Sequence, residues 1–261
     1  MELSIGNLKP SVCVDAVFEG VDMNEAVSTV ANLGYRAFEF WCWWEKDLDQ
    51  LRELSDRHEM EIASCCTRFI SLTRPEKRKE YLAGLEESIV AAKDLGCKTL
   101  ISQVGDQVPG VDRVDQHRSL VEGLKEAAGL LSGTGVTLVI EPLNEKVDHP
   151  GYYLVQSKEA FEIIDEVDSP EIQVVFDIYH QQIMDGDQIV RINQFKDYIA
   201  HYHTAGVPGR KELDDTQEIN YPAIMKAIAS TGYEGFVGHE FIPTSDQPIA
   251  SLKQAVQVCD V

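Results

Sequence analysis

The sequence predicts a single α/β domain, residues 1–261, folded as a (β/α)8 TIM barrel. Strand-like and helix-like segments alternate eight times along the chain, and no linker or low-complexity segment interrupts them. The length of 261 residues suits eight such units, because barrels of this kind typically have about 250 residues. An open doubly wound sheet is the competing architecture, but no Gly-x-Gly-x-x-Gly motif follows the first strand.

Short apolar runs and amphipathic segments alternate in the first half of the chain. Asp22 is expected to begin the first helix, because Glu25 follows three residues later as in a capping box. Gly34 should end that helix, and Gly96 should end the third one. Pro75 suits the first turn of the third helix. The strands are expected at Ser11–Val17, Ala37–Trp43, Ile62–Thr67 and Lys98–Gln103, and the later helices around Leu48–Leu54, Tyr81–Ala92 and Asp112–Ser132.

The second half of the chain repeats this alternation. Asn220 and Pro222 are expected to open a helix that Gly232 ends. The strands are expected at Thr137–Ile140, Gln173–Phe176, Tyr198–Tyr202 and Phe236–His239, and the other helices at Ser157–Val167, Ile189–Phe195 and Pro248–Val258. Each half therefore supplies four strand–helix units, as the barrel requires.

Four consecutive strands of the second half each run into a residue that can bind a divalent metal: Glu141, Asp177, His203 and Glu240. An apolar strand should not end in a charge unless that end is solvated or liganded. Two carboxylates alone could form a structural pair, but three carboxylates and a histidine at successive strand ends favour a metal site. In a barrel these strands are neighbours, and the chemistry lies at the carboxyl ends of the strands. We therefore expect the four side chains to converge.

The ligand types predict the cofactor and a reaction class. Carboxylates with one imidazole suit a single divalent ion, Mn²⁺, Mg²⁺, Co²⁺ or Zn²⁺, and the absence of thiolates argues against a closed structural zinc site. A cation with open positions can bind adjacent carbonyl and hydroxyl oxygens and acidify the neighbouring C–H. Glu141 and Glu240, on opposite flanks, could then remove the proton and return it to the next carbon. This pattern indicates aldose–ketose isomerisation through an enediolate.

Four segments carry a resemblance to a known family: Ile140–Asn144, Asp148–Leu154, Phe176–His180 and Val207–Arg210. They resemble the hydroxypyruvate isomerase family, which belongs with the sugar 3-epimerases and endonuclease IV among the xylose-isomerase-like TIM barrels. The resemblance implies a divalent metal held by Glu141, Asp177, His203 and Glu240, with the two glutamates exchanging the proton. It also implies that His180 and Arg210 contact the substrate, and an arginine can bind a carboxylate with two parallel hydrogen bonds.

The substrate that this resemblance implies is a small hydroxy-keto acid: hydroxypyruvate, converted to tartronate semialdehyde, or a 2-oxo-tetronate. His203 departs from that family, whose members carry a glutamine there, and matches the sugar 3-epimerases instead. A ketose 3-epimerase or sugar isomerase is therefore the main alternative, and a metal-dependent dehydratase is another. A DNA-repair endonuclease would need more histidines and a basic surface, and a non-catalytic barrel is disfavoured by the intact ligand set.

Four further features of the strands need an interpretation. His201 shares a strand face with His203 and is expected to be a hydrogen-bonded core histidine, or else a partner of the ligands. His239 should face the other way and be structural. Glu39 could line the pocket or pair with a buried base. The tryptophans at 41, 43 and 44 could form the pocket wall or lid, contact another subunit, or cover the barrel end. The remaining histidines of interest, His58, His117 and His149, are expected at the surface.

The composition limits the partners. The net charge is −21, from 44 acidic and 23 basic residues, which disfavours nucleic acid. No apolar run is long enough for a membrane helix, and Met1–Pro10 lacks the basic head and apolar stretch of a signal peptide. The six cysteines show no metal-binding spacing and are expected to be reduced and mostly buried in a cytoplasmic protein. The expected partner is a small keto acid or ketose, and the resemblance suggests a homo-oligomer.

Overall fold

Nine parallel strands form the centre of the computed structural model, which describes residues 8–244 and 247–260. Hydrogen bonds join them in the order β3-β2-β1-β9-β8-β7-β6-β5-β4. The strands are β1 (Lys9–Cys13), β2 (Ala37–Glu39), β3 (Glu61–Ile62), β4 (Cys65–Cys66), β5 (Thr99–Ser102), β6 (Thr137–Ile140), β7 (Ile172–Asp177), β8 (Ile199–Thr204) and β9 (Phe236–His239). Every pairing in this sheet is parallel.

The strands β3 and β4 are two parts of the third barrel strand. The Cys66 backbone N–H donates to the Trp41 carbonyl on the side of β2 at 2.9 Å. On the other side, the Thr67 N–H donates to the Ile101 carbonyl of β5 at 2.8 Å. The ring of strands therefore closes through this interrupted strand. With β3 and β4 counted as one strand, the sheet has the eight strands of a TIM barrel, which confirms the predicted fold class.

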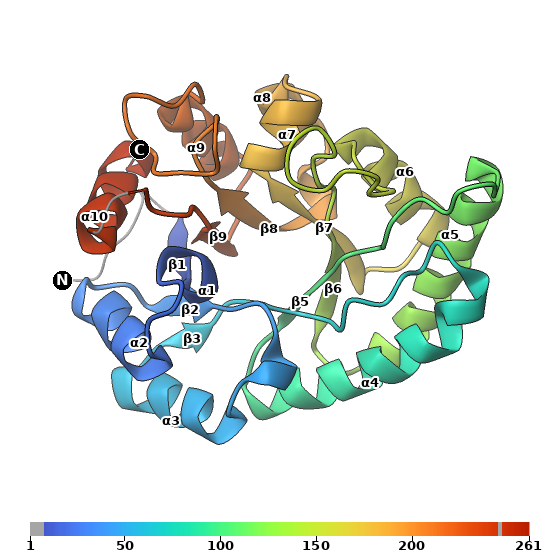
Figure 1. Cartoon of the computed structure of the whole chain (residues 1–261), viewed down its shortest axis with the longest axis horizontal. Coiled ribbons are helices and arrows are strands. Elements are labelled where there is room, and N and C mark those ends of the chain that lie inside the picture. The colour runs from blue at the N-terminus through green and yellow to red at the C-terminus, as the bar shows by residue number, and fades with distance from the viewer. Residues whose placement is uncertain (1–7, 245–246, 261) are drawn as a thin grey trace.

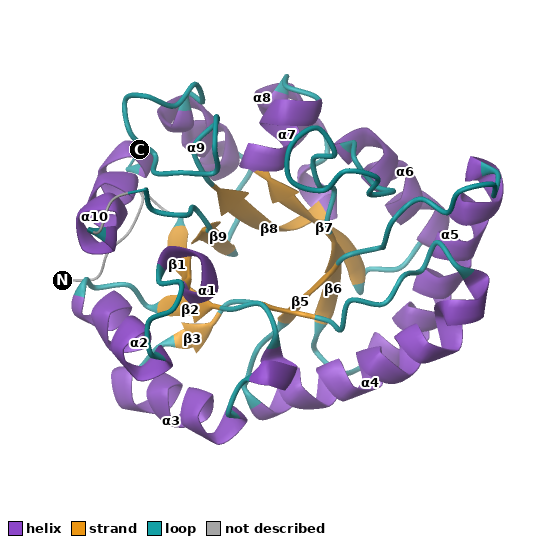
Figure 2. Ribbon diagram, in the orientation of Figure 1, coloured by secondary structure: helices purple, strands orange, loops and turns teal. Residues whose placement is uncertain are grey.

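Helices surround the ring of strands (Figure 1; Figure 2). The α-helices are α1 (Val14–Val17), α2 (Met23–Asn32), α3 (Leu48–His58), α4 (Arg78–Asp94), α5 (Arg113–Leu131), α6 (Ser157–Val167), α7 (Ile178–Met184), α8 (Gln188–Gln194), α9 (Tyr221–Ser230) and α10 (Pro248–Cys259), and the 3-10 turns are η1 (Trp43–Glu45), η2 (Pro75–Lys77) and η3 (Lys196–Tyr198). None of the helices in the described residues is both long and apolar enough to cross a membrane.

The side chains of each strand alternate between two apolar regions. Leu138 and Ile140 belong to the large core that the helices cover, whereas Val139 packs inside the barrel with Cys66, Ile101 and Val175. A residue two positions further along a strand points the same way. Glu141 and Asp177, two residues after Val139 and Val175, therefore face the barrel interior.

Some expected elements differ from the structure. The run Ser11–Val17 is not one strand, because β1 ends at Cys13 and the chain turns into α1. The strand expected over Ala37–Trp43 ends at Glu39. A helix was not expected at α7, where Asp177 caps the first turn by accepting hydrogen bonds from the backbone N–H groups of Tyr179 and His180. All six cysteines are free and five are buried, as expected.

Candidate active site at the carboxyl ends of the strands

The four strand-end residues converge in the barrel interior. Glu141 follows β6, Asp177 ends β7, His203 lies in β8 and Glu240 follows β9, so neighbouring strands supply them in turn. One ligand atom from each lies within 4.8 Å of the others. All four side chains are buried. The structure therefore brings together the residues that the sequence predicted as one cluster.

His203 lies at the centre of this cluster. Its Nδ1 atom lies 3.3 Å from Glu240 Oε2, 3.8 Å from Glu141 Oε1 and 4.0 Å from Asp177 Oδ2. This nitrogen is buried and has no hydrogen-bond partner among the residues that the structure describes. Buried polar atoms are normally satisfied, so a nitrogen that faces three carboxylates without a hydrogen bond is suited to bind a cation. One imidazole and three carboxylates form a donor set that fits a divalent cation.

Asp177 divides its two oxygens between structure and site. Its Oδ1 accepts the α7 capping bonds from the N–H groups of Tyr179, at 2.7 Å, and His180, at 3.2 Å. Its Oδ2 faces the cluster. Burial raises the pKa of Asp177 to about 7, with the His203 ring opposing this and the Glu240 charge adding to it. A cation at this site would therefore compete with a proton at neutral pH.

Glu240 is held as a carboxylate by two donors. The indole N–H of Trp41 donates to Oε1 at 2.6 Å, and an Arg210 N–H donates to Oε2 at 2.5 Å. Burial alone would raise the pKa of Glu240, but the positive charges of Arg210 and His203 outweigh it and hold this pKa well below its usual range.

The backbone of the loop after β8 orients the Arg210 side chain toward the cluster. Arg210 has a positive φ of 53°, and its carbonyl accepts a hydrogen bond from the Ile242 N–H at 2.7 Å. This bond ties the loop after β8 to the segment after β9. The Arg210 Nε atom is buried and has no hydrogen-bond partner in the described part of the chain. Only part of the guanidinium is therefore satisfied by Glu240.

His180 presents an N–H to the site. Its Nδ1 accepts from the backbone N–H of Asn144 at 3.1 Å and lies 2.8 Å from the Asn144 amide nitrogen. The Asn144 Oδ1 is taken by the N–H groups of Val147 and Asp148, which fixes the orientation of the amide. Nδ1 is thus an acceptor, and the ring proton is on Nε2. This nitrogen is buried, lies 3.6 Å from Asp177 Oδ2 and has no hydrogen-bond partner within residues 8–244 and 247–260. Burial and the nearby Arg210 charge lower the pKa of His180, so the ring is neutral.

A cavity of about 190 Å³ opens onto Glu141, His203, Arg210 and Glu240, whereas Asp177 and His180 lie behind its lining. It is lined by Trp41, Cys66, Phe69, Ile101, Gln103, Glu141, Leu143, His149, His203, Arg210 and Glu240. A larger cavity of about 460 Å³ lies on the other side of Trp41, beside Asp15 and Lys46, and none of the four clustered residues lines it. The smaller cavity is therefore the candidate substrate site.

Comparison with known proteins gives the family. The chain matches the xylose isomerase-like TIM barrel family over residues 27–260. The chain belongs to this family. Among its curated relatives, the putative hydroxypyruvate isomerase of Homo sapiens is 34% identical over 176 residues, which cover 66% of this chain and 64% of that protein. The hydroxypyruvate isomerase of Escherichia coli K12 is 30% identical over 245 residues, which cover 90% of this chain and 94% of that protein.

Two further comparisons place this member of the family. The 2-oxo-tetronate isomerase of Cupriavidus necator is 29% identical over 219 residues, covering 80% of this chain and 83% of that protein. The crystal structure of AP endonuclease, family 2, from Brucella melitensis is 27% identical, with a TM-score of 0.87 over 93% of this chain and 96% of that one. These curated relatives are isomerases by name.

The structure also places the other residues that the sequence singled out. His149 was expected at the surface, but it is half-buried in the cavity wall, with its ring 5.5 Å from that of His180. The expectation was wrong because the loop after Glu141 folds back over the site. Trp41 lines the cavity, as one of the interpretations expected. Trp44 packs edge-on against Phe69 at the cavity wall, with ring centres 5.2 Å apart.

Glu39 pairs with buried histidines rather than lining the cavity. Its carboxylate lies 2.8 Å from His201 Nε2 and 3.3 Å from His203 Nε2. His201 is a buried, hydrogen-bonded histidine, as favoured, and through Glu39 it is also connected to His203. His239 is buried away from the cluster, with Nδ1 2.8 Å from the Thr204 hydroxyl. The contact between Glu39 and His203 was not expected, although a carboxylate inside an apolar strand was a signal for it.

Proposed function

We propose that this family member is a divalent-metal-dependent isomerase that interconverts a small 2-oxo hydroxy acid and the isomer whose carbonyl lies on the adjacent carbon. Hydroxypyruvate and tartronate semialdehyde, or a 2-oxo-tetronate, are the proposed substrates. The observation that carries the proposal is the convergence of three carboxylates and an unpartnered imidazole nitrogen, with Arg210 beside them, at one small cavity. The names of the curated relatives from E. coli and C. necator support this substrate class.

The residues that would hold the cation are Glu141, Asp177, His203 and Glu240. A divalent cation supplies Lewis acidity, which polarises a carbonyl and stabilises negative charge on the substrate's oxygens. Asp177 and His203 have their other polar atoms committed to protein partners, so they act as ligands alone. Glu141 and Glu240 line the cavity, so their carboxylates can reach a substrate there. Both oxygens of Glu240 already accept hydrogen bonds from Trp41 and Arg210, so Glu141 is the glutamate that we propose removes the proton.

The two glutamates come from strands separated by β7 and β8, so a substrate between them can be approached from two sides. In hydroxypyruvate one glutamate takes a proton from the hydroxymethyl carbon. A proton is then returned to the neighbouring carbonyl carbon, and the hydroxyl proton passes to the former carbonyl oxygen. Atoms and electrons balance without another reactant. Such positioned proton transfer contributes about 10²–10⁴-fold to a rate.

Arg210 and His180 would fix the substrate. A guanidinium has five N–H donors, and Glu240 takes one of those of Arg210, so others are free for a substrate carboxylate. The Nε2–H of His180 is suited to a carbonyl or hydroxyl oxygen. Phe69 and Leu143 in the cavity wall would limit the access of water.

A ketose 3-epimerase is the second candidate. The observation in its favour is that Arg210 is already paired with Glu240, because a neutral sugar needs no free guanidinium. With glutamates on opposite sides of one carbon, one would remove a proton from one face of that carbon. The other would then return a proton to the opposite face, which inverts the configuration of the carbon.

The deciding experiment is a substrate screen in heavy water. Protein loaded with Mg²⁺ is incubated with hydroxypyruvate, 2-oxo-tetronates and neutral ketoses, and proton NMR follows substrate, product and deuterium incorporation. We expect conversion of a keto acid with deuterium on the carbon next to its carboxylate, and no conversion after treatment with EDTA. Turnover of a ketose alone would support the epimerase, and loss of water from the substrate would indicate a dehydratase.

A further inference from the structure

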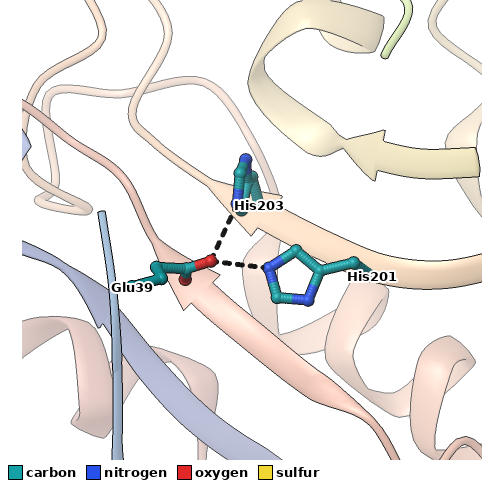
Figure 3. A group of neighbouring side chains, drawn as sticks. All are labelled: Glu39, His201 and His203. Carbon is teal, nitrogen blue, oxygen red and sulfur yellow. Dashed lines mark hydrogen bonds and ion pairs between the residues drawn. The ribbon is translucent and has the colours of Figure 1, made fainter. Parts of the chain in front are cut away.

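Glu39 has a buried carboxylate that lies outside the four-residue cluster. Four side chains of the described residues form hydrogen bonds with this carboxylate. Glu39 ends β2 and is 1% exposed. Its Oε1 accepts from the Ser11 hydroxyl at 2.8 Å, and its Oε2 accepts from the Ser64 hydroxyl. The Nε2 atoms of His201, at 2.8 Å, and of His203, at 3.3 Å, face the same Oε2 (Figure 3).

Burial of a carboxylate is costly unless donors surround it, so this arrangement has to be built into the sequence. An ion pair with His201 alone would explain the burial. It would not explain why the same oxygen also faces His203. That ring spans two environments: its Nε2 faces Glu39, and its Nδ1 faces Glu141, Asp177 and Glu240.

The two ring nitrogens of His203 must have different roles if one of them binds a cation. A histidine binds a metal through a nitrogen without a proton, and the other nitrogen then carries the proton and needs an acceptor. Since Nδ1 faces the carboxylate cluster, Nε2 must carry the proton. The acceptor that faces Nε2 is Glu39.

We infer that Glu39 is a positioning residue of the metal site, which accepts the Nε2 proton of His203 and thereby holds Nδ1 free and oriented for the cation. The inference rests on the proposed metal dependence and extends it to a residue that touches neither cation nor substrate.

Gly238 supports this inference independently. In β9 it is in register with Ser11 of β1 and with His203 of β8, so it lies between two of the four partners of Glu39. A Cβ atom at position 238 would lie 1.9 Å from Glu39 Oε1 and 2.9 Å from His203 Cδ2. Only glycine leaves room there for the carboxylate to approach His203.

Glu39, His201 and His203 could instead hold a cation of their own, since they also offer three ligand atoms close together. The separations of 2.8 and 3.3 Å between the carboxylate oxygen and the two nitrogens are those of hydrogen bonds. The serine hydroxyls on the same carboxylate add further donors. A hydrogen-bonded acceptor therefore explains the contacts better than a second cation.

The test is a double-mutant cycle on Mn²⁺ affinity, measured by calorimetry with full-length protein and no substrate. Glu39→Gln should weaken binding about 10–100-fold, the usual effect of losing such an acceptor. In a His203→Gln background, where no imidazole is left to orient, Glu39→Gln should change the affinity less than about threefold. Ser11→Ala is the matched control, because it removes a bond to Glu39 but not the one to His203, and should cost less than about fivefold.

Several outcomes would overturn the inference. Unchanged affinity in Glu39→Gln would do so, as would equal losses in both backgrounds, because a merely structural role is not coupled to His203. A stoichiometry of two Mn²⁺ ions per chain would also do so, because it would indicate that Glu39, His201 and His203 bind a cation of their own. Absence of Mn²⁺ binding by the wild-type protein would instead overturn the proposed metal dependence, and this inference with it.

A second measurement uses the wild-type protein and does not depend on a variant that folds. In Zn²⁺-loaded protein labelled with ¹⁵N-histidine, we expect His203 to show a proton on Nε2 and a metal-bound Nδ1. Metal binding at Nε2 would contradict the inference directly.

Discussion

Replacement of Arg210 by methionine tests the substrate class and the electrostatics of the site together. Arg210→Met removes the charge and keeps most of the aliphatic stem. The side chain is 17% exposed and its Glu240 partner 6%, so the pair is largely shielded from water. In the metal-free protein the variant leaves Glu240 beside two other carboxylates with His203 as its nearest cation, at 3.3 Å.

Two magnitudes follow from these contacts. A hydrogen bond to a charged group contributes about 1.5–3 kcal/mol, so KM for a keto acid should rise about 10–150-fold. Removal of one partner of a buried ion pair costs about 3–5 kcal/mol. In a protein of this size the melting temperature of the metal-free variant should therefore fall by roughly 5–15 °C. Saturating Mn²⁺ should recover much of this loss, because the cation replaces the missing positive charge.

Initial rates with hydroxypyruvate and with a neutral ketose give KM, and thermal unfolding in EDTA and in Mn²⁺ gives the stability. Arg191→Met is the matched control, because Arg191 is also partly buried and lies 3.8 Å from a carboxylate, that of Asp185, but is not among the residues that line the cavity. An unchanged KM for the keto acid in Arg210→Met would refute the role of Arg210 in carboxylate binding. A similar rise in Arg191→Met would show that the effect is not local.

Two other predictions concern the neighbouring groups. His180→Phe keeps an aromatic ring but removes the Nε2–H donor, together with the Nδ1 acceptor of the Asn144 N–H, so kcat should fall about 10²–10³-fold in steady-state assays. A wild-type kcat would exclude His180 from the reaction. Burial raises the pKa of Asp177 to about 7, so between about pH 4 and 7 the folded metal-free protein keeps a proton that the unfolded chain releases. The stability contributed by Asp177 should fall as the pH rises through this range. Melting temperatures in EDTA at pH 5 and pH 8 measure this fall, and saturating Mn²⁺ should remove it; a fall of the same size in Mn²⁺ would contradict the assignment of Asp177 as a ligand.

The sequence carried most of the information on the fold, because strand and helix periodicities alternate clearly. Where it failed, local chemistry outweighed periodicity. The apolar residues Val14 and Val17 extend the first strand pattern, yet they form a short helix that packs against the strands. The helix α7 was missed because its cap, Asp177, is also a strand end and was interpreted only as a ligand.

The cluster could be predicted because each of its members breaks an apolar strand at the same relative position. The contacts that set its chemistry could not. Trp41 donates to Glu240 across 199 residues of chain, and Glu39 meets His203 across 164. Such pairs depend on strand register and side-chain rotamers, which a single sequence does not give. The Asn144 amide that fixes the His180 proton depends on a turn in a loop, where periodicity carries no signal.

The most direct test of the proposed function is the transfer of deuterium from solvent to product by the Glu141→Gln variant. The metal-loaded variant is incubated with the keto acid in heavy water, and proton NMR measures deuterium at the carbon next to the carboxylate. We predict that exchange and turnover fall together by at least about 10², while Mn²⁺ still binds, because glutamine keeps an oxygen ligand but cannot accept the proton. Deuterium incorporation at the wild-type rate would contradict the account of Glu141 as a proton carrier.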